Sequence, residues 1–535
     1  MTEKRSPRHQ LLQKFRIFSQ AFFFLLFIYL LLETHYSGED YIGPVESFFH
    51  FDPLLGLTTF IASRGLLKAF LWALVSIILT ILFGRYICGW ACPFGAVHQF
   101  FSFLFKKMKW LKPKLQGNHL LFLKYAVLII LLISSVFTLD LAGYLDPLSL
   151  LYRSFALAIL PAFAVAGAGA ISVAANMGLN SLADGLAQNL QNLTINRTFH
   201  QGFFIGFIFL GIILLNLYRE RFWCRCLCPA GALLAFLARW NLVKVNVDAD
   251  KCIECKNCTL HCQTQATPFP NEDWQPRECV YCYTCSSQCP TAAITFPILP
   301  LPAASKSINF SRRKWIFSSM LSIAIVPLFR ISEAAKRAAE KLIRPPGALP
   351  ESEFLSLCVK CGECMKVCPT NALQPALNQA GPEGLWTPVV VPRIGYCEYY
   401  CSLCTQVCPT GALRELTIKE KTKIRIGSAW INKNRCIPYA LEEPCKVCEE
   451  QCPTSPKAII MVESEIMMGD GTWDIQDVPI VDLDLCIGCG ICETKCPVYD
   501  DPAIYCTSLG ESRSLEAGLF SDMYGDGMEE ETPRW

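Results

Sequence analysis

The chain has 535 residues, too many for one hydrophobic core, so we expect several domains. Its formal net charge of +2 excludes the strongly basic surface that nucleic-acid binding needs. A mean hydropathy of +0.32 and 52% hydrophobic residues are high for a wholly soluble protein and predict membrane segments.

The N-terminal half begins with a basic tail, residues 1–16, followed directly by an apolar run. Basic residues collect at the cytoplasmic ends of membrane helices, so the chain is expected to start inside the cell. A cleaved signal peptide is the alternative, but no small-residue cleavage site follows the run. Four spans with both ends inside are predicted, over residues 17–32, 66–83, 120–138 and 202–217. A further apolar segment, 148–175, predicts either another helix pair or a re-entrant piece.

An internal repeat joins these spans. The segment from Arg85 to Ala96 aligns without gaps with the segment from Arg221 to Ala232, and each contains a C-x3-C-P motif. Asp-Pro-Leu also recurs in both outer loops, beginning at Asp52 and at Asp146. The predicted fold class is therefore an α-helical membrane domain, residues 17–240, of two hairpins related by a pseudo-two-fold axis, followed by α+β ferredoxin-like domains.

The C-x3-C-P cysteines are predicted to converge near that axis and to form a tetrathiolate metal site at the cytoplasmic edge. Soft thiolate ligands favour iron as the first choice and copper as the second. Two separate dithiols are the alternative. The four residues are Cys88, Cys92, Cys224 and Cys228.

Residues 241–305 contain two cysteine runs and predict a cytoplasmic two-cluster ferredoxin module. In the bacterial run C-x2-C-x2-C-x3-C-P, three thiolates hold one [4Fe–4S] cluster and the fourth reaches the other cluster. One cluster is then expected on Cys252, Cys255, Cys258 and Cys289. The other is expected on Cys279, Cys282, Cys285 and Cys262.

Residues 306–350 join the two halves. Ser311-Arg312-Arg313-Lys314 precedes an apolar stretch to Phe329, which resembles a twin-arginine export signal placed internally. The same residues also fit the inner flank of a fifth span, and both interpretations place the following domain outside. A third interpretation keeps everything cytoplasmic, because the stretch is short and Pro327 interrupts it.

Residues 351–510 hold four more cysteine runs, which predict a four-cluster polyferredoxin and six [4Fe–4S] clusters in total. The runs are Cys358/Cys361/Cys364/Cys368, Cys397/Cys401/Cys404/Cys408, Cys436/Cys445/Cys448/Cys452 and Cys486/Cys489/Cys492/Cys496. The outer two runs have regular spacing and the inner two do not, so we expect a nested pairing in which like exchanges ligands with like. Sequential pairing is the alternative.

The 24 run cysteines, the four C-x3-C-P cysteines, Cys226 and Cys506 make up the 30 cysteines of the chain. A disulfide framework belongs to short secreted chains and does not explain repeated cluster-ligand spacings. Cys506 is left over and is expected to be an ordinary buried thiol. The tail, residues 511–535, is acidic and cysteine-free, and we expect it to be solvated.

In motif order the chain resembles a fusion of two ferredoxin-type families. The two C-x3-C-P motifs and the two-cluster module are similar to NapH, a membrane quinol dehydrogenase subunit. The half from Ser311, including the twin arginines and Arg344-Pro345-Pro346-Gly347-Ala348-Leu349, is similar to NapG. The C-x3-C-P core also resembles NosR and CcoG-type proteins, the latter acting in copper handling. The resemblance implies oxidation of membrane quinol and delivery of electrons to a periplasmic reductase or cytochrome.

The leading functional hypothesis is thus electron transfer from the membrane quinol pool to a periplasmic redox partner, in a bacterial inner membrane protein. No C-x-x-C-H haem motif and no dinucleotide fingerprint between a strand and a helix are present in the sequence. Quinol oxidation needs a proton acceptor, for which His50, Asp52 and Asp146 are the candidates, although Asp-Pro also caps turns and helices. One alternative is a maturation factor that reduces copper or thiols of a client enzyme. Another is a quinone reductase fed by cytoplasmic ferredoxin.

Overall fold

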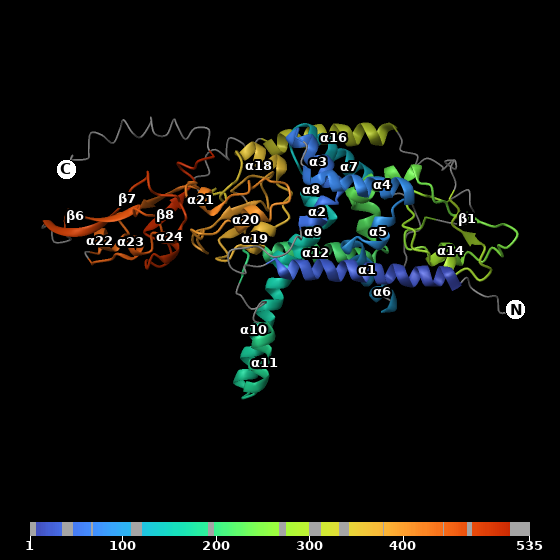
Figure 1. The fold of residues 1–535 in the computed structure, drawn as a ribbon, viewed down its shortest axis with the longest axis horizontal. Helices are drawn as coiled ribbons and strands as arrows, with labels where there is room; N and C mark the ends of the chain where they lie inside the picture. The colour runs from blue at the N-terminus through green and yellow to red at the C-terminus, as the bar shows by residue number, and fades with distance from the viewer. Residues whose placement is uncertain are drawn as a thin grey trace. The chain divides into compact units, whose positions relative to one another are not determined.

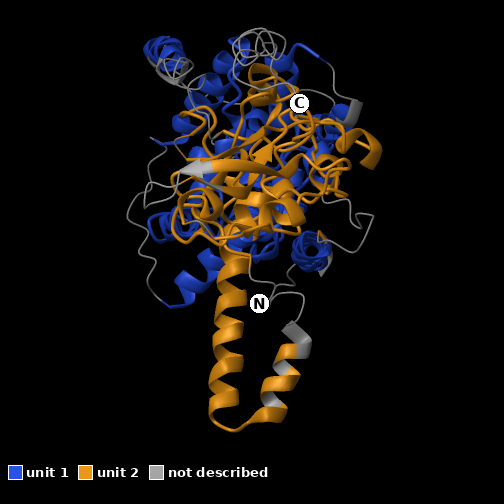
Figure 2. Cartoon of the chain, turned by 90° about the vertical axis from the view of Figure 1, so that its left-hand side faces the viewer, with its two compact units in different colours: residues 1–33, 43–155, 203–328 blue, residues 34–42, 156–202, 329–535 orange. Residues whose placement is uncertain are grey.

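The computed structural model of the chain describes residues 7–34, 46–65, 68–108, 120–190, 197–266, 274–298, 312–330, 342–377, 379–441, 443–467 and 473–513. They form two compact units (Figure 2). The first unit comprises residues 1–33, 43–155 and 203–328, and the second comprises 34–42, 156–202 and 329–535. Part of the predicted basic tail, including Lys4 and Arg5, lies outside the described residues, as do Ser311 and the tail from residue 514.

The first unit is mainly helical (Figure 1). Its longer helices are α1 Pro7–Glu33, α3 Pro53–Ser63, α4 Ala73–Phe83, α6 Pro93–Lys107, α7 Leu121–Val136, α9 Pro147–Ser154, α12 Gly202–Leu214, α13 Pro229–Leu237 and α16 Arg312–Arg330. Its short helical segments are α2 Glu46–His50, η1 Lys68–Trp72, α5 Tyr86–Trp90, α8 Ala142–Leu145, η2 Phe155–Ile159, η3 Leu215–Leu217, η4 Trp223–Leu227 and η5 Ala238–Trp240. Helix η2 is the point at which the chain passes into the second unit.

Two helices of the described chain are long and apolar enough to cross a membrane, His9–Glu33 and Pro147–Asn176. The second of these is the segment whose structure the sequence left open, and it forms one helical run through α9, η2 and α10 Leu160–Asn176. The other three predicted spans contain shorter apolar helices. Four spans are therefore not confirmed by helix length.

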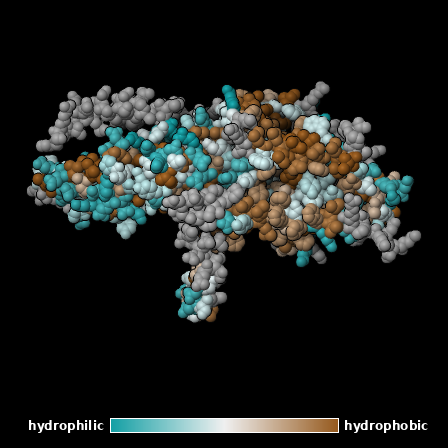
Figure 3. All heavy atoms as spheres, viewed as in Figure 1, coloured by the Kyte–Doolittle hydropathy of each residue, from teal (hydrophilic) through white to brown (hydrophobic). Residues whose placement is uncertain are grey.

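Apolar side chains nevertheless cover much of the face of the first unit that Figure 3 shows. Phe18 on α1 is 65% exposed, Phe203 on α12 is 88% exposed and Phe317 on α16 is 68% exposed. Exposed apolar surface of this extent is typical of a protein–protein or membrane-facing region. Together with the two apolar helices it indicates membrane association.

The first unit also contains the small ferredoxin module. Strands β1 Asn246–Val247 and β2 Ile294–Thr295 pair antiparallel, and the cysteine loops end in helices α14 Asn257–Leu260 and α15 Thr284–Ser287. Val245, Val247, Trp274 and Ile294 are buried against the ligand cysteines in one apolar core. The module is thus held by its cysteine loops and a minimal sheet.

The second unit contains the larger ferredoxin region and the helical hairpin of α10 and α11 Asn180–Leu190 (Figures 1 and 2). Its sheets are three antiparallel pairs: β3 Leu373–Pro375 with β4 Pro388–Val390, β5 Ser428–Ile431 with β8 Ile504–Thr507, and β6 Ile459–Met467 with β7 Trp473–Val481. Its short helices are α18 Glu351–Leu357, α19 Glu363–Val367, α20 Leu403–Gln406, α21 Ile418–Lys421, α22 Ile437–Ala440, α23 Val447–Glu450 and α24 Ile491–Lys495. The cysteine loops lie between these elements.

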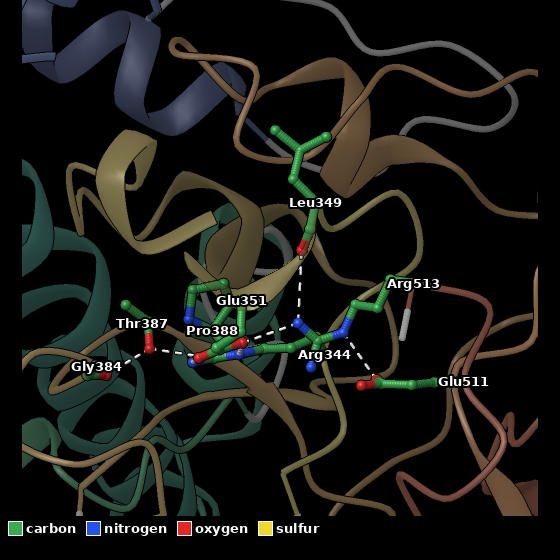
Figure 4. Close-up of polar contacts among 8 residues, drawn as sticks. All are labelled: Arg344, Leu349, Glu351, Gly384, Thr387, Pro388, Glu511 and Arg513. Atoms are coloured by element: carbon green, nitrogen blue, oxygen red, sulfur yellow. Dashed lines mark hydrogen bonds and ion pairs between the residues drawn. The ribbon is translucent and has the colours of Figure 1, made fainter. Parts of the chain in front are cut away.

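One ion-pair network closes the start of the larger ferredoxin region against its end (Figure 4). The buried Arg344 guanidinium binds Glu351 at 2.7 Å and donates to the Pro388 carbonyl at 2.8 Å. Arg513 binds the same Glu351 carboxylate at 2.8 Å and also pairs with Glu511. Glu351 therefore joins two chain segments that are 162 residues apart.

Candidate iron–sulfur and membrane-edge sites

The four regularly spaced cysteine runs share one backbone geometry. In each run, the residue before the second cysteine and the residue after it have a left-handed conformation. These residues are Glu254 and Lys256, Tyr281 and Tyr283, Lys360 and Gly362, and Gly488 and Gly490. Most side chains avoid this region of φ, and its recurrence at equivalent positions is typical of a backbone shaped for a function.

This geometry directs backbone N–H groups at the ligand sulfurs. The sulfur of Cys279 accepts from the N–H of Tyr281, that of Cys358 from Lys360 and that of Cys486 from Gly488. Hydrogen bonds to cluster sulfurs are one of the means by which a protein sets cluster potential. The left-handed residues thus contribute electrostatics as well as loop shape.

In the small module, cysteines from the two runs meet as the cross-ligation predicts. Cys262 lines one cavity together with the first three cysteines of the second run, Cys279, Cys282 and Cys285. Cys258 lies close enough to Cys255 and Cys289 to interact with them electrostatically. The first arrangement combines three cysteines of the second run with the fourth of the first run, and the second arrangement brings two cysteines of the first run to the fourth of the second run.

In the larger region, four cavities each gather four run cysteines. Their cysteine sets are Cys358/Cys361/Cys364/Cys408, Cys368/Cys397/Cys401/Cys404, Cys436/Cys445/Cys448/Cys496 and Cys452/Cys486/Cys489/Cys492. The nested pairing expected from like spacing is therefore wrong, and the sequential alternative is observed. The reason is local folding: run one is joined to run two through the β3–β4 pair, and run three to run four through the β6–β7 hairpin.

The donor chemistry of these cavities fits [4Fe–4S] clusters. Every cavity offers four sulfur ligands among mostly apolar side chains. Burial raises the pKa of the Cys285 and Cys361 thiols well above the ordinary value, so assembly of a metal centre there must displace protons. No group of three His, Cys, Asp or Glu side chains among the described residues could hold a single metal ion. Thiolates that bind separate irons of one cluster do not need to converge on a single point.

Cys506 is a residue that spacing could not place. It is buried on β8 and lines the same cavity as Cys486, Cys489 and Cys492. Its thiol interacts directly with that of Cys492. It is thus a fifth thiol beside a four-cysteine set rather than an unrelated core residue.

The four C-x3-C-P cysteines also come together. Cys228 lies close enough to Cys88, Cys92 and Cys224 to interact with each electrostatically. Cys92 caps α6 and Cys228 caps α13, because their sulfurs accept from the N–H groups of Gly95 at 3.4 Å and Gly231 at 3.2 Å. Both copies of the repeat therefore place a cysteine sulfur at the N-terminus of a helix, where the helix dipole favours a negative charge.

The candidate proton acceptors are brought together at helix N-termini. Asp52 caps α3 by accepting from Leu54 N–H at 2.8 Å, and Asp146 caps α9 by accepting from Ser149 N–H at 2.8 Å. Both side chains are buried, and the two carboxyl groups lie within hydrogen-bonding reach of each other. His50 lies on α2, with its ring edge-on to Phe70 at 6.0 Å. Both aspartates are caps, as the Asp-Pro motif allowed, and they also form a pair.

Three family models match parts of the chain. A 4Fe-4S binding domain matches residues 67–113 and again 201–247, which contain the two C-x3-C-P motifs. A 4Fe-4S dicluster domain matches residues 357–412, the first two runs of the larger region. A 4Fe-4S binding domain matches residues 479–499, the last run. The dicluster match agrees with the sequential pairing of the cavities.

Curated relatives match over short stretches. The methylamine utilization ferredoxin-type protein MauM of Methylorubrum extorquens is 45% identical over 71 residues, covering 13% of this chain and 31% of that protein. The ferredoxin-type protein NapG of Escherichia coli is 38% identical over 68 residues, covering 13% and 29%. An uncharacterized protein of Methanocaldococcus jannaschii is 25% identical over 212 residues, covering 38% and 62%.

These alignments cover less than two thirds of the length of each of those relatives. No solved structure matches the chain. The chain is an iron–sulfur electron-transfer protein related to the ferredoxin-type proteins NapG and MauM.

Proposed function

We propose that this protein oxidises membrane quinol and passes the electrons through six [4Fe–4S] clusters to a redox partner outside the cytoplasm. The observation that carries the proposal is the set of four-cysteine cavities, in which each pair of neighbouring runs forms two adjoining sites. Six clusters on the 24 run cysteines would form a chain of electron carriers without a substrate pocket of their own. The name of a relative, the putative electron transport protein YccM of Escherichia coli, supports the same class of function.

The proposed topology has four spans as two pseudo-symmetric hairpins, with α16 as a fifth span or export signal. The N-terminus and the small module would then lie in the cytoplasm, and residues 351–510 in the periplasm. Exposed apolar side chains on α1, α4, α12 and α16 support contact with lipid. A reporter fused after residue 350 that is active only in the periplasm tests this topology, and its inactivity there would contradict it.

For quinol oxidation, the paired Asp52 and Asp146 are the proposed proton acceptors. Two buried carboxyl groups at this separation hold one proton between them, because two buried negative charges would repel each other. One member can then accept a proton while the other retains its own. Each of the two aspartates caps the N-terminus of an apolar helix. A quinol dissolved in the bilayer could approach these helices.

The test uses the full chain and two electron donors. We expect Asp146→Asn to slow menaquinol-driven cluster reduction by about a hundredfold, the usual contribution of a general base, and to leave dithionite-driven reduction unchanged. Asp140→Asn is the matched control, because Asp140 is also a buried aspartate, which accepts from Ala142 N–H at 2.9 Å. Equal quinol rates in both variants would overturn the proposed proton acceptors. Wild-type clusters that stay oxidised with excess menaquinol would overturn the quinol donor itself.

A further inference from the structure

Each copy of the internal repeat contributes one buried arginine that lies against the other copy. Arg85 and Arg221 are the first residues of the two aligned segments. The Arg221 Nη2 donates to the carbonyl oxygens of Cys88 and Gly95, each at 3.2 Å, and both acceptors belong to the first copy. A guanidinium from the second copy thus covers the C-x3-C-P motif of the first.

The reciprocal contact is present on the other side. A Cβ at Gly231 of the second copy would lie 3.1 Å from Arg85 Nη2 and 3.3 Å from the Cys228 sulfur. At the equivalent position of the first copy, a Cβ at Gly95 would lie 2.9 Å from Arg221 Nη2. The glycine in each C-P-x-G sequence therefore leaves room for the arginine of the opposite copy, and at Gly95 also for the Cys88 carbonyl oxygen, which a Cβ would approach to 2.9 Å.

The described residues balance the charges of these two arginines only in part. Arg85 and Arg221 are each 2% exposed, and a guanidinium stays protonated even when buried. Arg85 approaches Glu278 at 3.4 Å, but Lys124 binds both oxygens of that carboxylate, at 2.6 and 2.8 Å. Among the described residues Arg221 has no carboxylate partner, and its Nε and Nη1 are buried without an acceptor.

Other buried side chains nearby add positive charge. Arg219 and Arg225 both donate to the neutral Gln265 amide oxygen, and Arg16 donates to the amide oxygens of Gln20 and Gln99. Uncompensated buried charges cost several kcal/mol each, roughly, so this excess requires an anionic group. Four neutral thiols, or two disulfides, would not supply it.

We infer that Cys88, Cys92, Cys224 and Cys228 hold a seventh iron–sulfur cluster, and that Arg85 and Arg221 are positioning residues that balance its negative charge. A [4Fe–4S] core held by four thiolates is a dianion when oxidised and gains one more negative charge when reduced. The centre takes up one electron and gives the same electron to its neighbour, so no bond is made or broken. This inference rests on the proposed electron-transfer function and adds a carrier to it.

A cluster fits better than a single ion. The 4Fe-4S binding domain model matches both copies of the motif. The same four sulfurs could otherwise take copper, and metal analysis separates the two.

The two arginines differ in one respect. Arg85 also donates to the Arg277 carbonyl at 3.1 Å, beside Glu278 and the ligand Cys279. The same loop packs against the first copy, where Trp90 Nε1 donates to the Tyr281 carbonyl at 3.1 Å. Arg85 therefore lies beside both the proposed cluster and the second cluster of the small module, whereas Arg221 contacts the C-x3-C-P site.

The test is iron analysis and a redox titration followed by electron paramagnetic resonance on the full chain. We expect Cys88→Ser/Cys228→Ser to lose one cluster's iron and one signal while the ferredoxin signals remain. We expect Arg221→Gln to lower the potential of that signal alone, because the reduced cluster loses a stabilising cation. Arg85→Gln should lower it together with one signal of the small module. A tenfold change in the reduction constant corresponds to about 59 mV for one electron.

Arg85→Lys and Arg221→Lys keep the charge and control for folding, and both should retain near-wild-type potentials. Unchanged iron and signals in the double cysteine variant, or copper in place of iron, would overturn the seventh cluster. Unchanged cluster potentials in Arg85→Gln and Arg221→Gln would overturn the role of the arginines. Normal menaquinol reduction of the six ferredoxin clusters in these variants would leave the proposed function standing, so the two failures are distinguishable.

Discussion

The ferredoxin loops and the C-x3-C-P site bring four sulfurs together in different ways. In the loops, left-handed residues such as Lys360 and Gly488 direct backbone dipoles at the sulfurs. At the C-x3-C-P site, helix N-termini cap two sulfurs, and two buried arginines lie against the two motifs. Backbone dipoles are built into a short local sequence, whereas buried charges depend on distant partners. Loss of one partner should therefore do far more damage at the C-x3-C-P site than in a loop.

The largest effect is expected from the loss of Glu278, because two buried positive charges share its carboxylate. Glu278→Ala leaves Lys124 and Arg85 without their shared anion, and both are fully or almost fully buried. Breaking such a pair costs about 3–5 kcal/mol, so we expect the variant to accumulate poorly and to unfold at a lower temperature in detergent.

The control for Glu278→Ala is Glu220→Ala. This change breaks the ion pair with Lys106, whose side chain is 60% exposed, and exposed pairs contribute about 0–1 kcal/mol. Similar unfolding temperatures for the two variants would show that the buried charges are compensated in some other way.

The second prediction concerns acid stability in the larger ferredoxin region. Burial tends to raise the pKa of Glu351, but the charges of Arg344 and Arg513 outweigh it and hold the pKa at about 2. A carboxyl group whose folded pKa is depressed stabilises the fold above its unfolded pKa, about 4.3, and that stability is lost as pH falls towards 2. Glu351→Gln should cost about 2–3 kcal/mol at neutral pH and flatten the decline below pH 4.

Acid unfolding followed by circular dichroism measures this difference on the full chain. Glu420→Gln serves as the control, because Glu420 is an exposed residue that completes the capping box of the short helix α21 with Thr417. If Glu351→Gln lost stability below pH 4 as steeply as the wild type, the Arg344–Glu351–Arg513 network would not govern acid sensitivity.

Sequence patterns were informative where the chemistry is local. The ligand runs, the internal repeat and the meeting of the four C-x3-C-P cysteines follow from spacing and alignment. The pairing of the larger ferredoxin runs does not, because it depends on which strands join neighbouring runs rather than on the similarity of their gaps. The Lys124–Glu278 pair has no sequence signal at all, since its members are 154 residues apart. Asp52 and Asp146 could be nominated one by one, but their contact could not.

The third prediction separates left-handed strain from cluster binding. Glu254→Gly keeps the φ of 53° accessible at a residue whose side chain is exposed, and it should change stability by less than about 1 kcal/mol with full iron content. Gly488→Ala places a Cβ 2.5 Å from the Gly427 carbonyl carbon at a φ of 71°, so we expect about 1–3 kcal/mol of destabilisation and loss of one cluster. Iron analysis compares the two variants. Equal iron content in both would argue against the close loop approach.

The smallest effect is expected at Cys506, where the loop arrangement carries one additional thiol. Its sulfur interacts with Cys492, and its N–H donates to Glu493 at 2.7 Å, which fixes its place on β8. Cys506→Ala should retain all iron, because Cys452, Cys486, Cys489 and Cys492 already supply four ligands. It should cost about 1 kcal/mol for the small cavity and lower the potential of that cluster slightly, since one donor to a ligand sulfur is lost. If Cys506→Ala lost iron, Cys506 would be a cluster ligand. The four-sulfur arrangement that the loops share with the C-x3-C-P site would then not hold for this cluster. Because Cys506→Ser keeps a donor, it should restore the potential, and this restoration distinguishes a hydrogen-bonding role from simple packing.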